Sequence, residues 1–252
     1  MKTVTILGCG WLGSVVAKKL SNRFHLKVTT TTLKKDEAFK RLGYNSFILD
    51  ENCLESLSDL LDCDYLLMAF PPSKFQNYLG FLNSIYTHEK FNTIKHSIFI
   101  SSTSIYDKKE GVYTESSDIK TPSSKLVYEA ENYVKNQTST IFRCAGLMGE
   151  NRIAGSYFAA KEVTNTLSGV NYVHQSDVFE AIVFCYEKKL KGVFNLCAPL
   201  HPSKKEVYSK NALKYGFESP VFMDDKNYER IIEASKIEEY GFEYTYPNPL
   251  EF

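Results

Sequence analysis

The sequence predicts an α/β fold with a doubly wound parallel sheet and a small C-terminal lobe. A glycine-rich turn at residues 8–13 follows the apolar run at residues 4–7 directly. Short strand-like and helix-like runs then alternate over the first 150 residues. The strand-like runs are rich in Val, Ile, Leu, Phe and Thr and do not alternate with polar residues for most of their length, which is typical of parallel strands buried on both faces.

The first half of the chain repeats a strand–helix–strand pattern. Repetition of this kind produces right-handed crossovers and a doubly wound sheet. The expected strands are 2–8, 25–32, 44–49, 64–70, 95–101 and 139–144, and the expected helices are 12–20, 34–41, 53–61, 73–87 and 122–136.

The pattern changes after about residue 150. Ser176 and Asp177 are N-cap candidates for one helix, while Ser203 and Gly216 are expected to begin and end another. We therefore expect residues 1–150 to form a nucleotide-binding core, and residues 151–252 to complete the sheet and form a small substrate lobe. The expected elements are a loop and helix at 151–169, a helix at 176–189, a strand at 192–196 and a helix at 203–215.

The glycine-rich turn has the spacing G-x-G-x-x-G between a strand and a helix. Gly8 permits the tight turn, Gly10 lets a pyrophosphate approach the backbone, and Gly13 lets the helix pack closely. The helix that begins at Trp11 and Leu12 presents unpaired N–H groups and the positive end of its dipole to phosphates. The turn therefore predicts a dinucleotide-binding site.

Bulk composition excludes several classes of protein. The 30 basic and 30 acidic residues cancel, so no nucleic-acid or anionic-membrane surface is expected. No apolar run approaches the ~18 residues of a membrane span, and the N-terminus leads directly into a strand, so we expect a cytoplasmic protein. The six cysteines form no C-x-x-C pair and have no histidines at zinc-site spacing, so no metal is expected.

Several later motifs occur in the order found in one large enzyme family. These are residues 99–106 (FISSTSIY), Glu115, residues 122–126 (PSSKL), Glu129, and residues 142–149, 173–178 and 192–196. Across nearly the whole chain this series resembles the extended short-chain dehydrogenases/reductases, and within them the sugar-nucleotide epimerase/dehydratase branch. The resemblance implies a Rossmann fold that binds NAD or NADP.

The resemblance also implies roles for individual residues. Ser102 would orient the reacting substrate oxygen, Lys125 would bind the nicotinamide ribose, and Asp50 would lie near the adenine. Arg152 could bind a substrate phosphate or carboxylate. Family members often dimerise through the helices expected at 73–87 and 122–136, so a homodimer is implied. Further positions expected to line the cofactor are Ala69, Phe70, Pro71, Ser101, Cys144, Ala145 and Gly146.

Two departures from the family pattern stand out. The usual G-x-x-G-x-x-G would place a glycine at Leu7, whereas here the glycine is Gly8. The catalytic Y-x-x-x-K retains Lys125 but has Thr121 in place of the tyrosine, and a threonine hydroxyl is far less acidic than a phenol. Tyr106, Tyr113 and Tyr128 are alternative acid/base candidates, of which Tyr128 is expected one helical turn beyond Lys125.

The second strand indicates which cofactor is preferred. NAD sites usually carry an acidic residue about 20 residues beyond the glycine turn, and none is present here. Thr31, Lys34 and Lys35 could instead bind a 2′-phosphate, which favours NADP over NAD. The alternative is a solvated loop with two ordinary surface lysines.

Two functions remain open from the sequence. The first is an NAD(P)-dependent oxidoreductase or epimerase-like enzyme that acts by hydride transfer on a small polar or nucleotide-linked substrate. The alternative is a non-catalytic NAD(P)-binding sensor or interaction module, which the replacement of the tyrosine by Thr121 favours.

Overall fold

The computed structural model describes residues 1–252, and they divide into two compact units. Each unit combines segments from both sides of residue 150, so the expected domain division stays a prediction. The first unit is Met1–Ser101, Lys125–Phe142 and Ile182–Val193, and the second is Ser102–Ser124, Arg143–Ala181 and Phe194–Phe252.

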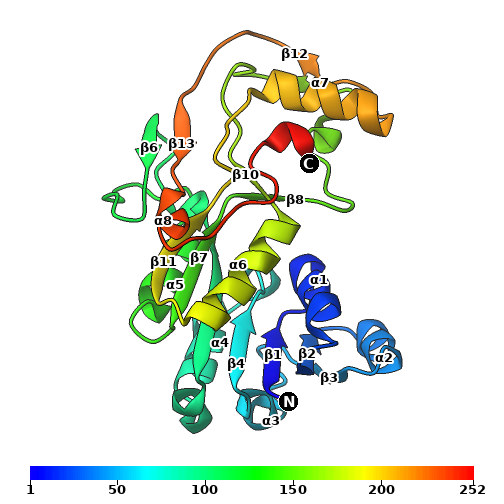
Figure 1. Cartoon of the computed structure of the whole chain (residues 1–252), viewed down its shortest axis with the longest axis vertical. Coiled ribbons are helices and arrows are strands. Elements are labelled where there is room, and N and C mark those ends of the chain that lie inside the picture. Colours follow the sequence, from blue (N-terminus) through cyan, green and yellow to red (C-terminus); the bar gives the residue numbers. More distant parts are fainter. The chain divides into compact units, whose positions relative to one another are not determined.

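A seven-stranded parallel sheet confirms the predicted fold class (Figure 1). Its spatial order is β11-β7-β5-β4-β1-β2-β3. The chain therefore winds outward from β1 in one direction and returns to wind outward from β4 in the other, so the topological switch point lies between these two neighbours. The strands are β1 (Thr3–Leu7), β2 (His25–Thr30), β3 (Asn45–Ile48), β4 (Tyr65–Met68), β5 (His96–Ser102), β7 (Thr140–Cys144) and β11 (Gly192–Leu196).

The helices that accompany this sheet are amphipathic. In the helix that follows β1, Leu12, Val16 and Leu20 recur every four residues and are buried, whereas Lys18 and Lys19 are at the C-terminal end, where cations complement the dipole. The helices are α1 (Trp11–Leu20), α2 (Leu33–Arg41), α3 (Leu57–Leu61), α4 (Tyr78–Tyr86), α5 (Lys125–Val134) and α6 (Gln175–Lys188). None is long and apolar enough to cross a membrane.

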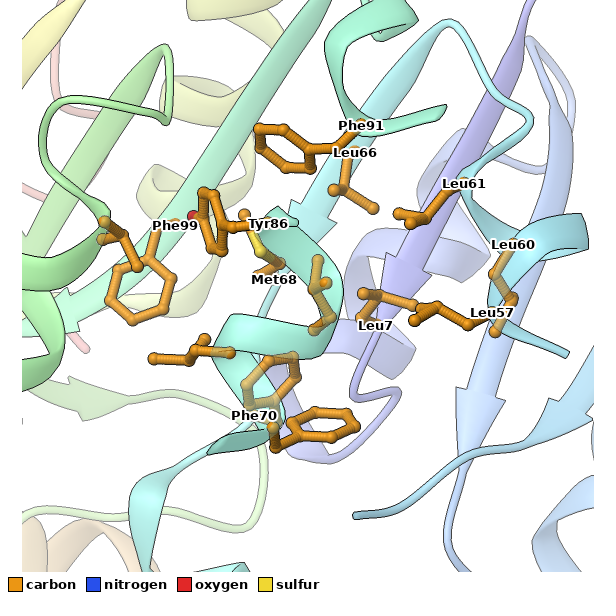
Figure 2. Close-up of a cluster of buried hydrophobic side chains, with 14 of the residues drawn as sticks. Leu7, Leu57, Leu60, Leu61, Leu66, Met68, Phe70, Tyr86, Phe91 and Phe99 are labelled. Carbon is orange, nitrogen blue, oxygen red and sulfur yellow. The ribbon is translucent and has the colours of Figure 1, made fainter. Parts of the chain in front are cut away.

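One large apolar cluster forms the core of the first unit (Figure 2). Leu7, Leu66 and Met68 contribute from β1 and β4, and Leu60 contributes from α3. These side chains are at most 1% exposed, and full burial of one such side chain contributes roughly 1.5–3 kcal/mol. The cluster therefore anchors the two strands at the switch point.

The second unit contains three two-stranded parallel pairs and a smaller core. The core is formed by Val163, Val170, Val207 and Tyr208 together with Ala154. The pairs are β8 (Gly146–Met148) with β10 (Tyr172–His174), β9 (Glu162–Val163) with β12 (Val221–Phe222), and β6 (Gly111–Tyr113) with β13 (Arg230–Ile232). The longest helix that lies entirely in this unit is α7 (Lys204–Tyr215).

The predicted ends of α7 are confirmed. The Ser203 hydroxyl accepts a hydrogen bond from the Glu206 N–H, and the Glu206 carboxylate accepts one from the Ser203 N–H, which makes a complete capping box. Gly216 ends the helix with φ of +71°, a left-handed conformation that glycine adopts without strain.

Several other local predictions were wrong, among them the starts of the helices expected at 53–61 and 73–87, which begin at Leu57 and Tyr78. Residues 151–169 contain no α-helix, because Asn151, Gly155 and Ala160 all have positive φ, which interrupts a right-handed helix. Helix α5 begins at Lys125 rather than at residue 122. Asp177 lies in the first turn of α6 rather than before it, and its carboxylate accepts hydrogen bonds from the backbone N–H groups of residues 245 and 246.

Candidate functional site

The glycine turn after β1 is tightly packed at its first glycine. Gly8 has φ of +90°, and a Cβ atom there would lie 2.8 Å from the Phe70 Cβ. The Gly8 N–H donates to the Thr29 hydroxyl and the Cys9 N–H donates to the Thr29 carbonyl, both at 2.8 Å. These bonds tie the turn to β2, so its shape is part of the fold.

The other two glycines of the motif differ from one another. A Cβ at Gly13 would lie 2.5 Å from the Gly8 carbonyl oxygen, so glycine is needed there for α1 to pack against the turn. A Cβ at Gly10 would meet no atom within 4 Å. The fold does not require glycine at this position, and the space beside it can admit a ligand.

The N-terminus of α1 suits an anion. Gly10 is its N-cap residue, no side chain caps it, and the first turn carries no acidic residue. Helix N-termini attract phosphates through their N–H groups and dipole. Since this terminus follows β1 at the switch point, the residues present fit the pyrophosphate of a dinucleotide.

Cys9 lies within the turn and is buried. Burial raises the pKa of its thiol to about 12, although the Ser14 hydroxyl and Lys35 act in the opposite direction. The thiol therefore stays protonated at neutral pH and contributes packing rather than nucleophilic chemistry.

The end of β2 presents positive charge. Thr31, Lys34 and Lys35 are exposed, and neither lysine forms an ion pair. The nearest acid in sequence, Asp36, is buried and lies 2.8 Å from Lys40, whose ammonium lowers the pKa of the Asp36 carboxyl. The carboxylate nearest in sequence to this strand end is therefore already neutralised by Lys40.

The remaining expected cofactor residues of the first unit have local partners. The Asp50 carboxylate accepts the Asn52 N–H at 2.8 Å. The Ala69 N–H donates to the Leu7 carbonyl, and the Phe70 ring packs against other aromatic rings of the core cluster. The Ser101 hydroxyl donates to buried Glu131 at 2.7 Å. Pro71 is exposed and lacks an N–H.

The second unit contains a pocket of about 470 Å³ that includes Ser102. Four hydroxyl side chains, one phenol and two basic residues line it together with Ala145 and Gly146, and no carboxylate does. The lining residues are Ser102, Thr103, Ser104, Lys108, Ser123, Ala145, Gly146, Tyr228 and Arg230. Ala145 and Gly146, expected as cofactor residues, are thus on the wall of this pocket, whereas Cys144 is buried.

Of the expected catalytic residues, Ser102 lines the pocket, whereas Thr121 and Lys125 are exposed outside it. The Ser102 hydroxyl accepts the Ser104 N–H at 3.1 Å and lines the pocket. Thr121 is exposed, does not line the pocket, and precedes α5, so it is not one helical turn from Lys125. The Lys125 side chain is 83% exposed and lies 3.5 Å from Glu129.

Two of the alternative tyrosines are engaged in structural bonds. Tyr106 is fully buried, and its hydroxyl donates to Asn195 at 2.6 Å and accepts from Arg143 at 2.8 Å. The Tyr113 hydroxyl donates to the Lys109 carbonyl. Tyr128 is half-buried on α5. Neither Tyr106 nor Tyr113 has a hydroxyl available to a substrate.

Sequence reasoning assigned no role to two pocket residues that lie far from Ser102 in the sequence. These residues are Tyr228 and Arg230, which lie more than 100 positions beyond Ser102. The Tyr228 hydroxyl donates to the Lys108 carbonyl. The pairing of β13 with β6, in which Arg230 is opposite Gly111, accounts for their position. No local sequence motif predicts a pairing between strands that are so far apart in the sequence. The expected substrate residue Arg152 is exposed in a turn outside the pocket lining.

Comparison with known proteins finds relatives that match across the full length of the chain. The chain is 35% identical to the Escherichia coli K12 protein YeeZ over an alignment of 269 positions, gaps included, which covers 99% of this chain and 98% of YeeZ. No protein-family model matches the chain.

Solved structures share the fold at low identity. A UDP-N-acetylglucosamine 4-epimerase from Methanobrevibacter ruminantium M1, in complex with UDP-N-acetylmuramic acid, has a TM-score of 0.80 at 16% identity, covering 99% of this chain and 95% of that one. A UDP-glucuronic acid 4-epimerase variant from Bacillus cereus, in complex with a UDP-sugar and NAD, has a TM-score of 0.73 at 17% identity, covering 99% and 96%.

Proposed function

The chain belongs to the family of the Escherichia coli protein YeeZ and has the extended short-chain dehydrogenase/reductase fold, and we propose that it is an NAD(P)-dependent oxidoreductase or epimerase-like enzyme. The observation that supports this most directly is the glycine turn, which is closed at Gly8 and Gly13 and open at Gly10. A purely structural turn has no need of glycine at the open position.

The proposed roles follow the two units. In the first, Gly10 and the N-terminus of α1 bind the pyrophosphate, Thr31 and Lys34 bind the adenosine ribose with its phosphate, and Lys125 binds the nicotinamide ribose. In the second, Ser102 orients the reacting oxygen of the substrate. A bound nicotinamide supplies the hydride donor or acceptor.

The proposed substrate is small and polar or nucleotide-linked. The hydroxyl-rich lining of the pocket supports this class, since hydroxyls donate to and accept from sugar oxygens. The epimerases that share the fold are solved with UDP-sugars. A cytoplasmic location and a homodimer formed through α4 and α5 stay predictions from the sequence.

A second function has its own support. Thr121 replaces the family tyrosine, and Lys125 is exposed rather than held beside it. Without a phenol at that position the protein could bind NAD(P) as a non-catalytic sensor or interaction module. Oxidation of bound NADPH by UDP-sugar ketone analogues would support the enzyme, whereas unchanged NADPH beside tight cofactor binding would support the sensor.

Trp11 provides a direct test of cofactor binding. It is the only tryptophan and lies at the start of α1, so its fluorescence is expected to change on binding. Titration with NADP(H) and NAD(H) should give a saturable change. A flat response to all four compounds would refute the dinucleotide site.

Cofactor preference is expected to depend on the lysines after β2. Because Lys34 and Lys35 are exposed and unpaired, NADP(H) should bind about tenfold more tightly than NAD(H), in line with ~1.5–3 kcal/mol per well-made charged contact. Lys34→Ala with Lys35→Ala should remove the preference. Lys18→Ala, at the opposite end of α1, is the matched control. Equal or tighter binding of NAD(H) by the unmodified protein would contradict this expectation.

A further inference from the structure

Arg230 is held rigidly at the wall of the pocket. Its Nε donates to the Asp107 carbonyl at 3.0 Å and its Nη2 donates to the Thr103 carbonyl at 3.1 Å. The guanidinium lies over the Tyr113 ring, 5.3 Å from the ring centroid. These contacts leave the two N–H groups of Nη1 without a protein partner.

No carboxylate forms a salt bridge with Arg230, although the Asp107 charge attracts the guanidinium from a longer distance. The nearby Asp107 carboxylate instead accepts the backbone N–H groups of Lys120 and Thr121, at 3.1 and 2.8 Å. The pocket contains no acidic residue, and Lys108 adds a second unpaired cation. Partial burial lowers the pKa of Arg230, which reflects the cost of desolvating its charge. An unpaired, half-buried guanidinium is costly, so its presence calls for an anionic ligand.

Hydroxyl groups complete the donor set around this cation. The Ser102 hydroxyl accepts from Ser104 N–H and keeps its own proton for another acceptor. The Ser104 hydroxyl has no protein partner, whereas the Ser123 hydroxyl donates to the Tyr106 carbonyl. Donors from Ser102, Ser104 and Arg230 therefore line one pocket, and such a set matches the oxygens of a carboxylate or phosphate.

We propose that this pocket selects an anionic substrate, whose carboxylate or phosphate is bound by Arg230 on the same fragment whose reacting oxygen Ser102 orients. This inference rests on the proposed function and names its substrate class. The negative charge belongs to the reacting sugar or hydroxy-acid fragment and not solely to a remote nucleotide. Arg230 is thus a specificity-determining residue, and Lys108 adds to the positive field at the exposed side of the pocket.

The proposal can be tested with three small probes of similar size: glucuronate, glucose 6-phosphate and neutral glucose. Binding to the full chain is measured by ligand-observed NMR and calorimetry. At least one acid should bind at least tenfold more tightly than glucose, and comparing the two acids separates carboxylate from phosphate recognition. If glucose binds as tightly as both acids, or if neither acid binds, the proposal is overturned.

Two substitutions in the pocket test where the anionic group of the ligand binds. Arg230→Gln should weaken binding of the preferred acid about tenfold or more and leave glucose unchanged. Arg23→Gln, which changes an exposed arginine that does not line the pocket, should have no effect. Arg230 also donates hydrogen bonds to two backbone carbonyls, so its replacement could lower stability. The melting temperature of Arg230→Gln is therefore compared with that of the unmodified protein. Lys108→Gln is the second variant, because the exposed Lys108 side chain forms no bond that the fold needs, and it should weaken the acid severalfold.

The outcomes distinguish this inference from the function on which it rests. Unchanged affinity for the acid in Arg230→Gln and in Lys108→Gln would overturn it, even if Trp11 fluorescence still reported dinucleotide binding. A flat Trp11 titration with intact, Arg230-dependent acid binding would instead refute the dinucleotide site and leave the anion pocket in place.

Discussion

Replacement of Gly10 by valine is expected to abolish binding of NAD(P) while the protein stays folded. A side chain at residue 10 meets no protein atom within 4 Å, and φ of −78° there is outside the left-handed region. The valine would fill the space assigned to the pyrophosphate. We expect no saturable change in Trp11 fluorescence and a loss of stability of about 1 kcal/mol, the usual size of a changed N-cap.

Gly13→Ala is the matched comparison within the same motif. Its Cβ would lie 2.5 Å from the Gly8 carbonyl oxygen, so this smaller substitution should lower the melting temperature more than Gly10→Val does. Urea denaturation and cofactor titration of both variants separate the fold from the site. Normal dinucleotide affinity in Gly10→Val would remove the main support for the proposed function.

Acid is expected to destabilise the protein through His96. This residue is buried in β5, and its Nε2 lies 2.9 Å from the Thr140 hydroxyl. That hydroxyl donates to the Leu190 carbonyl, so it accepts from the Nε2–H of a neutral imidazole. Burial, with a contribution from Lys191, lowers the pKa of His96 to about 4.

The direction of the pH effect follows from this pKa. An unfolded histidine has a pKa of about 6.5, so the folded state binds its proton more weakly. The contribution of His96 to stability is complete above pH of about 6.5 and is lost as the pH falls toward about 4. The loss is on the order of 3 kcal/mol, since one pKa unit corresponds to about 1.4 kcal/mol.

The measurement is the free energy of unfolding in urea across this pH range. His96→Gln, whose amide N–H can still donate to Thr140, should be less stable at neutral pH but should show a shallower loss on acidification. Because acidic groups contribute equally to both proteins, the difference in slope isolates His96. Equal slopes in the two proteins would show that His96 does not carry the effect.

The sequence was sufficient for the features that depend on neighbouring residues. Expected strands at 64–70 and 192–196 correspond to β4 (Tyr65–Met68) and β11 (Gly192–Leu196), because short apolar runs indicate buried parallel strands. The ends of α7 were also predictable, since a serine three residues before a glutamate and a terminal glycine satisfy the helix ends locally.

For the glycine turn, the sequence predicted the elements around it, and the structure shows which of its glycines the fold requires. Its spacing after an apolar run predicted a strand, a turn and a helix, and all three are present. The structure alone distinguishes Gly8 and Gly13, which Phe70 and the Gly8 carbonyl constrain, from Gly10, which nothing constrains. That difference depends on which atoms of the segment after β4 and of the turn lie beside each glycine, and it separates a structural glycine from one that leaves room for a ligand.

The composition of the pocket was decided by tertiary structure. Ser102 was identifiable from a motif, but Arg230 and Tyr228 join it only because β13 pairs with β6 across more than 100 residues. The start of α5 at Lys125 likewise depends on distant contacts, since the N–H groups of Ser123 and Ser124 donate to the carbonyls of Tyr106 and Ser104. Local propensity and spacing determine strands, caps and the turn, whereas long-range backbone pairing decides which side chains share a pocket.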